Sequence, residues 1–278
     1  HVNKNVSRIE ARYNVGALRY RSQTLIKDIE LLLDYVGFAL KMASNSPNSF
    51  AYYDQDLYKE DFKKIDPSGY TASIFDSIPA QLSKNKKRFV LSQSTSKKKS
   101  DRDDERMYDL IDSKTVLISH NTADPRVSLS LSKDLDSYKL YLADTGLFVT
   151  LLFMDRPSTE NELYAKLLAD KLPANLGYLY ENVVAQMIAA TDRDLYYHTW
   201  EKENSSHYYE IDFLVSQGTK VNVIEVKSSG TGKHESLTQF RERFSKVIGE
   251  SFVLSQKDRK KEGTISFIPV YMTDFILK

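Results

Sequence analysis

The stretch Glu210–Ser229, EIDFLVSQGTKVNVIEVKSS, decides the fold of this chain. Two runs that alternate apolar and polar residues flank the dipeptide Gly218-Thr219, and such a pair is typical of a two-residue hairpin loop. The stretch therefore predicts two antiparallel strands, 208–216 and 220–227. In that register Asp212 lies directly across from Glu225.

The same register predicts that the hairpin has one polar and one apolar face, because side chains alternate along a strand. The polar face carries three carboxylates and one lysine: Glu210, Asp212, Glu225 and Lys227. The opposite face carries the pairs expected to pack: Ile211 with Val226, and Phe213 with Ile224. Opposed Cβ atoms are about 5 Å apart, and two carboxylates that close repel each other unless a cation lies between them or one is protonated.

These residues predict a site for Mg²⁺ (or Mn²⁺), since hard cations take carboxylate oxygens as ligands. Asp212 and Glu225 are the expected ligands, with Glu210 in support, and metal-assisted phosphodiester cleavage is the chemistry that such a site suits. Lys227 is expected to orient the attacking water and to offset charge in the transition state. The alternative is a cross-strand ion-pair cluster at a sheet edge, in which Glu210 pairs with Lys227.

A helix over 176–190 precedes the hairpin, and its apolar residues recur at helical spacing. Glu181 falls on the edge of this packing stripe, where a charge is costly without a partner. If the helix covers the polar face of the hairpin, Glu181 points toward the same metal. Otherwise its carboxylate reaches out to solvent.

Composition excludes several classes of protein. The chain has no cysteine, which removes disulfides, thiolate zinc sites and cysteine nucleophiles and fits a cytoplasmic location. Its apolar runs are shorter than the roughly 20 residues of a membrane helix, so no membrane partner is expected. The net charge of +1 gives no signal for nucleic acid on average, and such a signal must come from local clustering.

Three regions are expected along the chain: a helical N-terminal segment (1–50), a winged-helix-like region (51–137) and an α/β domain (138–278). Helices over 22–43, 56–65, 72–82 and 103–112, a strand-like piece at 89–91 and a strand at 115–118 fall in the first two. The basic residues of the second region are candidates for nucleic-acid binding: Lys84, Lys86, Lys87, Arg88, Lys97, Lys98 and Lys99. A helical subdomain with a solvated lysine loop remains the alternative to the winged helix.

The third region begins with a strand at 138–142 and a helix at 147–154. After the 176–190 helix and the hairpin come a helix over 235–247 and strands at 251–255 and 265–271. This order is typical of a mixed sheet flanked by helices.

The segments ENVVAQMI (181–188) and EIDFLVSQGTKVNVIEVKSS resemble the PD-(D/E)xK nuclease superfamily, which has a restriction-endonuclease-like fold. That resemblance implies that Glu181 is the first-helix acid, Asp212 the central acid, and Glu225 and Lys227 the E-x-K. More narrowly, YKLYLADTGLFVTLL (138–152) and GYLYENVVAQMI (177–188) are similar to a C-terminal domain of unknown function in bacterial and archaeal AAA-type ATPases. The segments LYKEDFKKIDPSGYTASIFDSIPAQL (57–82) and YDLIDSKTV (108–116) look like the region before that domain.

This resemblance implies an ATPase module as a partner, yet the chain has no G-x-x-x-x-G-K-[ST] motif. The nearest segment, Gly230-Thr231-Gly232-Lys233, has Lys227 where the first glycine is needed and His234 where Ser or Thr is needed. We therefore expect no ATP site. The chain begins at His1, so we expect either a fragment of a longer ATPase or a protein that has lost that half.

The leading expectation is a nuclease-like, DNA-associated region. Two alternatives stay open. One is a non-catalytic DNA-binding module with a vestigial metal site, and the other is a protein-interaction module that forms a homo-oligomer.

Overall fold

The computed structural model describes residues 50–84, 88–95, 101–153, 177–203, 205–228 and 234–277. The chain divides into two compact units, residues 1–61 with 149–174 and residues 62–148 with 175–278. The described residues of the first unit belong to helices α3 (Phe50–Ile65) and α7 (Thr145–Phe153). The helix expected over 22–43 lies outside the described residues. In the part of the chain that is described, no helix has the length and apolar character needed to cross a membrane.

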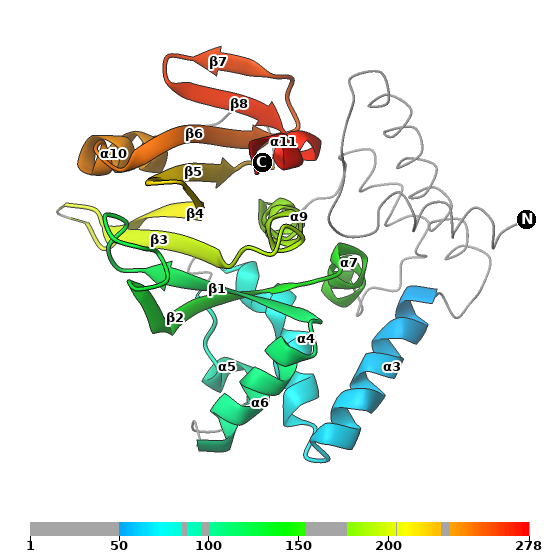
Figure 1. Ribbon diagram of the computed structural model, residues 1–278. Coiled ribbons are helices and arrows are strands. Elements are labelled where there is room, and N and C mark those ends of the chain that lie inside the picture. The colour runs from blue at the N-terminus through cyan, green and yellow to red at the C-terminus, as the bar shows by residue number, and fades with distance from the viewer. Residues whose placement is uncertain are drawn as a thin grey trace, which may run out of the picture. The chain divides into compact units, whose positions relative to one another are not determined.

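One mixed sheet forms the centre of the second unit, and the described residues contribute eight strands to it in the order β2-β1-β3-β4-β5-β6-β8-β7 (Figure 1). The strands are β1 (Val116–Thr122), β2 (Lys133–Leu142), β3 (Leu195–Glu201), β4 (Tyr208–Gln217), β5 (Lys220–Val226), β6 (Ile248–Ser255), β7 (Lys260–Glu262) and β8 (Ile265–Pro269). Three neighbouring pairs are parallel, namely β1 with β3, β5 with β6 and β6 with β8. The expected α/β class, a mixed sheet flanked by helices after a mostly helical region, is confirmed.

The expected boundary between residues 137 and 138 falls inside β2. The strand expected at 115–118 is part of β1, which pairs with both β2 and β3. Helices α4 (Tyr70–Leu82) and α6 (Asp101–Asp112) pack near β2 and β1, respectively. The residues placed in a winged-helix-like region thus contribute a strand to the same sheet that holds the candidate site.

The basic segment between α4 and α6 is only partly described, because Lys86, Lys87, Lys97, Lys98 and Lys99 lie outside the described residues. The piece expected to be strand-like at 89–91 leads instead into a turn and the short helix α5 (Ser92–Thr95). Two basic side chains of this segment form hydrogen bonds to other residues of the chain. Lys84 donates to Gln93 Oε1 (2.5 Å), and Arg88 donates to the carbonyl of Asp136 (2.6 Å).

The β4–β5 hairpin has the predicted register. Its ladder runs from Gln217 opposite Lys220 to Phe213 opposite Ile224, on either side of Gly218-Thr219. Gly218 has a φ of 59°, the left-handed conformation that this turn requires.

The expectation that only one face of the hairpin packs is wrong. Every residue of β5 from Val221 to Val226 is buried, because β5 is an inner strand with cover on both faces. Helix α10 (Glu235–Phe244) covers one face, where its apolar residues join a core cluster: Leu237, Phe240 and Phe244 with Leu214, Val223 and Val253. On the other face Phe213 packs on Tyr141 of β2, with 5.8 Å between ring centroids, and helix α9 (Gly177–Ala189) lies near β5.

Candidate metal centre

The candidate site lies where the regular β4–β5 ladder ends. Beyond the pair of Phe213 and Ile224, Asp212 Oδ2 accepts a hydrogen bond from the backbone N–H of Val226 at 2.8 Å. On its other side β4 contains a bulge, because the pairs Tyr196–Leu214 and His198–Ile211 enclose one residue of β3 and two of β4. In a regular strand, side chains alternate strictly between the two faces of the sheet. The bulge and the side-chain hydrogen bond explain how Asp212 departs from this alternation and still stays buried, at 6% exposed.

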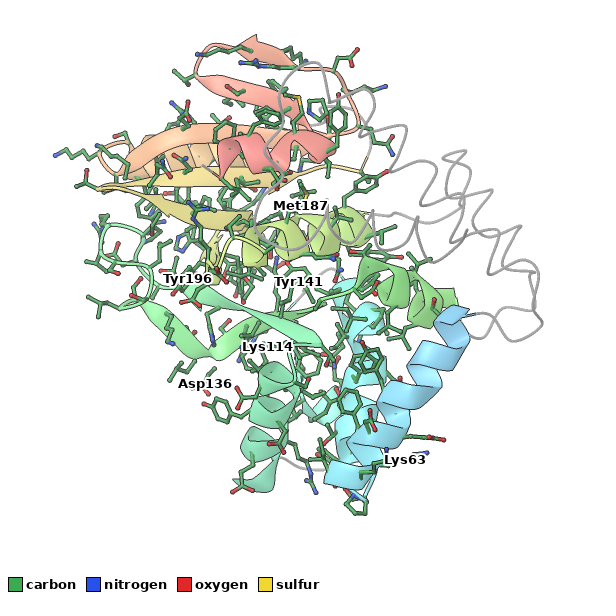
Figure 2. All side chains as sticks on the ribbon, turned by 45° about the vertical axis from the view of Figure 1, so that its right-hand side comes forward. Lys63, Lys114, Asp136, Tyr141, Met187 and Tyr196 are labelled. Carbon is green, nitrogen blue, oxygen red and sulfur yellow. The ribbon has the colours of Figure 1, made fainter. Side chains whose placement is uncertain are left out.

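Helix α9 brings Glu181 to the same place. The carboxamide of Asn182 accepts from the N–H of Leu142 (2.8 Å) and donates to the carbonyl of Leu142 (3.0 Å), which fixes the helix on β2. Tyr141 of β2, labelled in Figure 2, donates to Glu181 Oε2 across 3.5 Å. Glu181 is 2% exposed. One carboxylate oxygen each of Glu181, Glu210 and Asp212 lies within 4.8 Å of the others.

A lysine that the sequence analysis did not single out lies among these acids. Lys139 of β2 is fully buried, and its Nζ is 2.7 Å from Glu210 Oε1 and 3.9 Å from Glu181 Oε2. Burial lowers the pKa of Lys139, but the negative charges of Glu210, Glu181 and Asp212 outweigh it and raise that pKa, so the lysine stays charged. We call these four residues the Lys139 cluster. The available signal was a single lysine inside the apolar strand pattern of residues 138–142.

Glu225 and Lys227 form a second charged group, the Glu225–Lys227 pair. Glu225 is 4% exposed, and its Oε1 is 2.5 Å from Lys227 Nζ. Its Oε2 is also buried, but it has no hydrogen-bond partner among the residues that the structure describes. Burial is the largest influence on this carboxyl and raises its pKa; the charge of Asp212 adds to the rise, while Lys227 and His234 oppose it.

The structure therefore groups the predicted residues differently from the simple hairpin scheme. Asp212 lies with Glu181 and Glu210, as expected if α9 covers this end of the hairpin. Glu210 pairs with Lys139, whereas Lys227 pairs with Glu225. Asp212 and Glu225 are close enough for their charges to interact, so the two groups adjoin at Asp212.

One observation in particular indicates that the carboxylates here suit a small divalent cation. A buried carboxylate oxygen without a partner is costly in a protein interior, and a hard cation is the ligand that satisfies it best. Glu225 Oε2 is such an atom among the described residues. Asp212 could supply a second oxygen, because a carboxylate accepts about four hydrogen bonds or ligands. Glu181 and Glu210 already have a cation of their own, the ammonium of Lys139.

Part of this region matches a known family. The sequence profile described as "Domain of unknown function (DUF4143)" matches residues 176–273. No curated protein matches the chain. The crystal structure of protein VC1899 from Vibrio cholerae is 12% identical over 87% of this chain, with a TM-score of 0.25, and this chain spans 59% of that protein. A TM-score this low does not show a shared fold. The matched family region contains Glu181, Glu210, Asp212, Glu225 and Lys227, whereas Lys139 precedes it.

Proposed function

We propose that the sheet β1–β8 and the helices packed on it form a PD-(D/E)xK-like, DNA-associated domain that cleaves phosphodiester bonds with a divalent cation. The observation that carries this proposal is Glu225 Oε2, a buried atom with no hydrogen-bond partner in the part of the chain that the structure describes, where the β4–β5 ladder ends beside Asp212 and Lys227. In line with the resemblance to AAA-type ATPases, the proposed partner is an ATPase module supplied by another segment or chain.

Asp212 and Glu225 would hold Mg²⁺ or Mn²⁺, which supplies a Lewis acid for the phosphate and lowers the pKa of a bound water. Lys227 Nζ lies 2.5 Å from Glu225 Oε1, and its side chain is 28% exposed, so it can reach a substrate oxygen. There it would orient the attacking water and stabilise the developing negative charge. Lys139 acts as a positioning residue, because it fixes Glu210 and neutralises Glu181 beside Asp212.

The basic residues on and just before β7 support the proposal of a polyanionic substrate. Glu225, Val253, Phe267 and Lys260 are consecutive partners across β5, β6, β8 and β7 and so form one row of the sheet. Three strand spacings separate Lys260 from Glu225, about 14 Å, or about four nucleotides of a DNA strand. The exposed basic side chains of this segment are Lys257, Arg259, Lys260 and Lys261. They would contact phosphates several nucleotides away from the scissile bond.

A second candidate function has its own supporting observation. The Lys139 cluster places a buried ammonium among three acids, and a protein that needs no metal there would keep such an arrangement for folding alone. This favours a non-catalytic module in which the acids are vestigial.

Cleavage of linear, branched and single-stranded DNA by the full chain tests the proposal, with Mg²⁺, with Mn²⁺ and with EDTA. We expect metal-dependent cleavage that disappears in Asp212→Asn and in Lys227→Met. The matched controls Glu250→Gln and Lys246→Met change exposed residues elsewhere and should cleave like the wild type.

The outcomes separate the candidates. DNA binding without cleavage under any condition would leave the non-catalytic module. Absence of both DNA binding and metal binding would point to the protein-interaction alternative instead.

A further inference from the structure

The ammonium of the Lys139 cluster is held from more than one side. The Nζ of Lys139 is 2.7 Å from Glu210 Oε1 and 3.9 Å from Glu181 Oε2, and the side chain has no exposed surface. The same Nζ lies over the ring of Tyr197, 4.7 Å from its centroid, and the hydroxyl of that ring is 3.2 Å from Ser137 Oγ. Two carboxylates and an aromatic face therefore fix the position of this charge.

The acids of the cluster have the spacing of ligands to a single ion. One carboxylate oxygen each of Glu181, Glu210 and Asp212 lies within 4.8 Å of the other two. Oxygens on opposite sides of Mg²⁺ or Ca²⁺ are about 4 to 5 Å apart, because each lies about 2.0 to 2.6 Å from the ion. Lys139 Nζ directly contacts two of these three acids. The protein thus places its own cation at carboxylates that have metal-ligand spacing.

Asp212 connects this cluster to the Glu225–Lys227 pair. Its Oδ2 accepts a hydrogen bond at 2.8 Å from the backbone N–H of Val226, the residue after Glu225. Two ions in a phosphodiester-cleaving site are about 3.5–4 Å apart, so one carboxylate between them can serve both. Asp212 has such a place between two cation positions, and at one of them the cation is a lysine.

We propose that the Lys139 ammonium takes the place of a second divalent cation, so that this domain binds one ion, held by Asp212 and Glu225. The inference rests on the metal site of the proposed function and adds the number of ions. A fixed ammonium repels a second cation nearby. It also compensates the charges of Glu181 and Glu210 when divalent ions are scarce, which makes Lys139 a positioning residue for the acids of the site.

Counting the bound ions tests the inference, with Mn²⁺ as the probe and the EPR signal of free Mn²⁺ as the readout. We expect the full chain to bind one ion and Lys139→Met to bind two, because Glu181 and Glu210 would then lack their cation. Adding Glu210→Gln to Lys139→Met should return the count to one, since it removes a charged ligand. The control Lys133→Met changes an exposed lysine of the same strand and should leave the count at one.

Two further measurements allow for a Lys139→Met chain that folds poorly. Mn²⁺ should raise the unfolding temperature of Lys139→Met by more than that of the wild type, because two bound ions stabilise more than one. The double variant with Glu210→Gln should respond like the wild type. The count in the wild type needs no variant: a second bound Mn²⁺ there would overturn the inference.

The two counts also separate this inference from the proposed function. No bound ion in the wild type but one in Lys139→Met would contradict only the proposed function. One ion in the wild type and one in a folded Lys139→Met would contradict only the role of the lysine. If the wild type cleaves DNA, its rate should depend on Mn²⁺ with a Hill coefficient of about one, and a sigmoidal dependence would contradict the single ion.

Discussion

The Lys139 cluster and the Glu225–Lys227 pair are neighbouring charged groups that differ in how their carboxylates are paired. In the first, a fully buried ammonium is 2.7 Å from one carboxylate and 3.9 Å from a second. In the second, a lysine that is 28% exposed at its side chain satisfies one oxygen of Glu225, and the other oxygen has no partner among the described residues. Acidic residues alone therefore do not identify a metal site. The proposed site rests instead on the oxygen that has no partner among the described residues.

The largest expected effect comes from removing the cation of the first group. Lys139→Met would leave the buried Glu181 and Asp212, and the partly exposed Glu210, without their counter-charge, and breaking a buried ion pair in this way costs about 3–5 kcal/mol. Urea unfolding followed by circular dichroism measures the loss. Lys133→Met, an exposed change on the same strand, should cost less than about 0.5 kcal/mol. Equal stability of the two variants would contradict a structural role for the buried lysine.

The second prediction concerns a divalent cation. A ligand that binds only the folded state at 100 times its dissociation constant adds about 2.7 kcal/mol to the free energy of unfolding. We expect Mn²⁺ to stabilise the wild type by this route and to have no such effect on Glu225→Gln, in which the unsatisfied charged oxygen is gone. Thermal unfolding with Mn²⁺ and with EDTA provides the comparison. A similar rise in both proteins would place the cation elsewhere.

The third prediction concerns DNA affinity, which the end of the sheet near Glu225 should support more strongly than the opposite end of the same strands. Replacing Lys257, Arg259 and Lys261 together with alanine should weaken DNA binding in EDTA by about tenfold, or about 1.4 kcal/mol. The slope of log affinity against log salt should become shallower by up to about 2.7, which is about 0.9 for each phosphate that the variant no longer neutralises. The triple alanine variant of Lys220, Arg243 and Lys246 removes the same charge near the start of β5 and β6, and serves as the control. Equal weakening in both variants would indicate attraction by net charge alone.

The smallest expected effect is the pH dependence of Glu225. Its pKa in the folded state is raised above 4.5, mainly by burial, so the folded state binds this proton more tightly than the unfolded state does. Its contribution to stability is therefore fully present below pH 4.5 and is lost as the pH rises through the folded pKa. Glu225→Gln removes this loss, so at pH 7 its stability should lie within about 1 kcal/mol of the wild type and should improve relative to it between about pH 4 and pH 7. A steady relative decline over that range would show that the charged form is the stabilised one.

Local patterns in the sequence predicted much of the fold. The hairpin register followed from one turn dipeptide, and the four apolar residues that predicted the 72–82 helix are buried in α4: Ile74, Phe75, Ile78 and Leu82. Strand β3 was not predicted. Its first four residues are all buried, so they lack the alternation that marks a half-buried strand, although aromatic residues are frequent in it. Strand β7 has three residues, which is too short for any periodicity.

Local sequence patterns predicted the site less well than they predicted the fold. The spacing of Asp212, Glu225 and Lys227 is a property of one hairpin, and it could be recognised within a short stretch of sequence. The role of Lys139 depends on its contacts with Glu181 and Glu210, which lie on other helices and strands. The bulge at Asp212 has no glycine to mark it, so strict alternation gave the wrong grouping of its neighbours.

The position of β2 and β1 in the sheet has a practical consequence for dissecting this protein. A piece cut to the matched family region, residues 176–273, would retain β3 to β8 but lose the strand that pairs with β3 in parallel and the only lysine in the Lys139 cluster. It would present β3 as an open edge, which favours association with other chains, and it would leave Glu181, Glu210 and Asp212 without the lysine that pairs with them. Fragments for expression should therefore begin before β1 at Val116, even though the recognisable family segment begins only at residue 176.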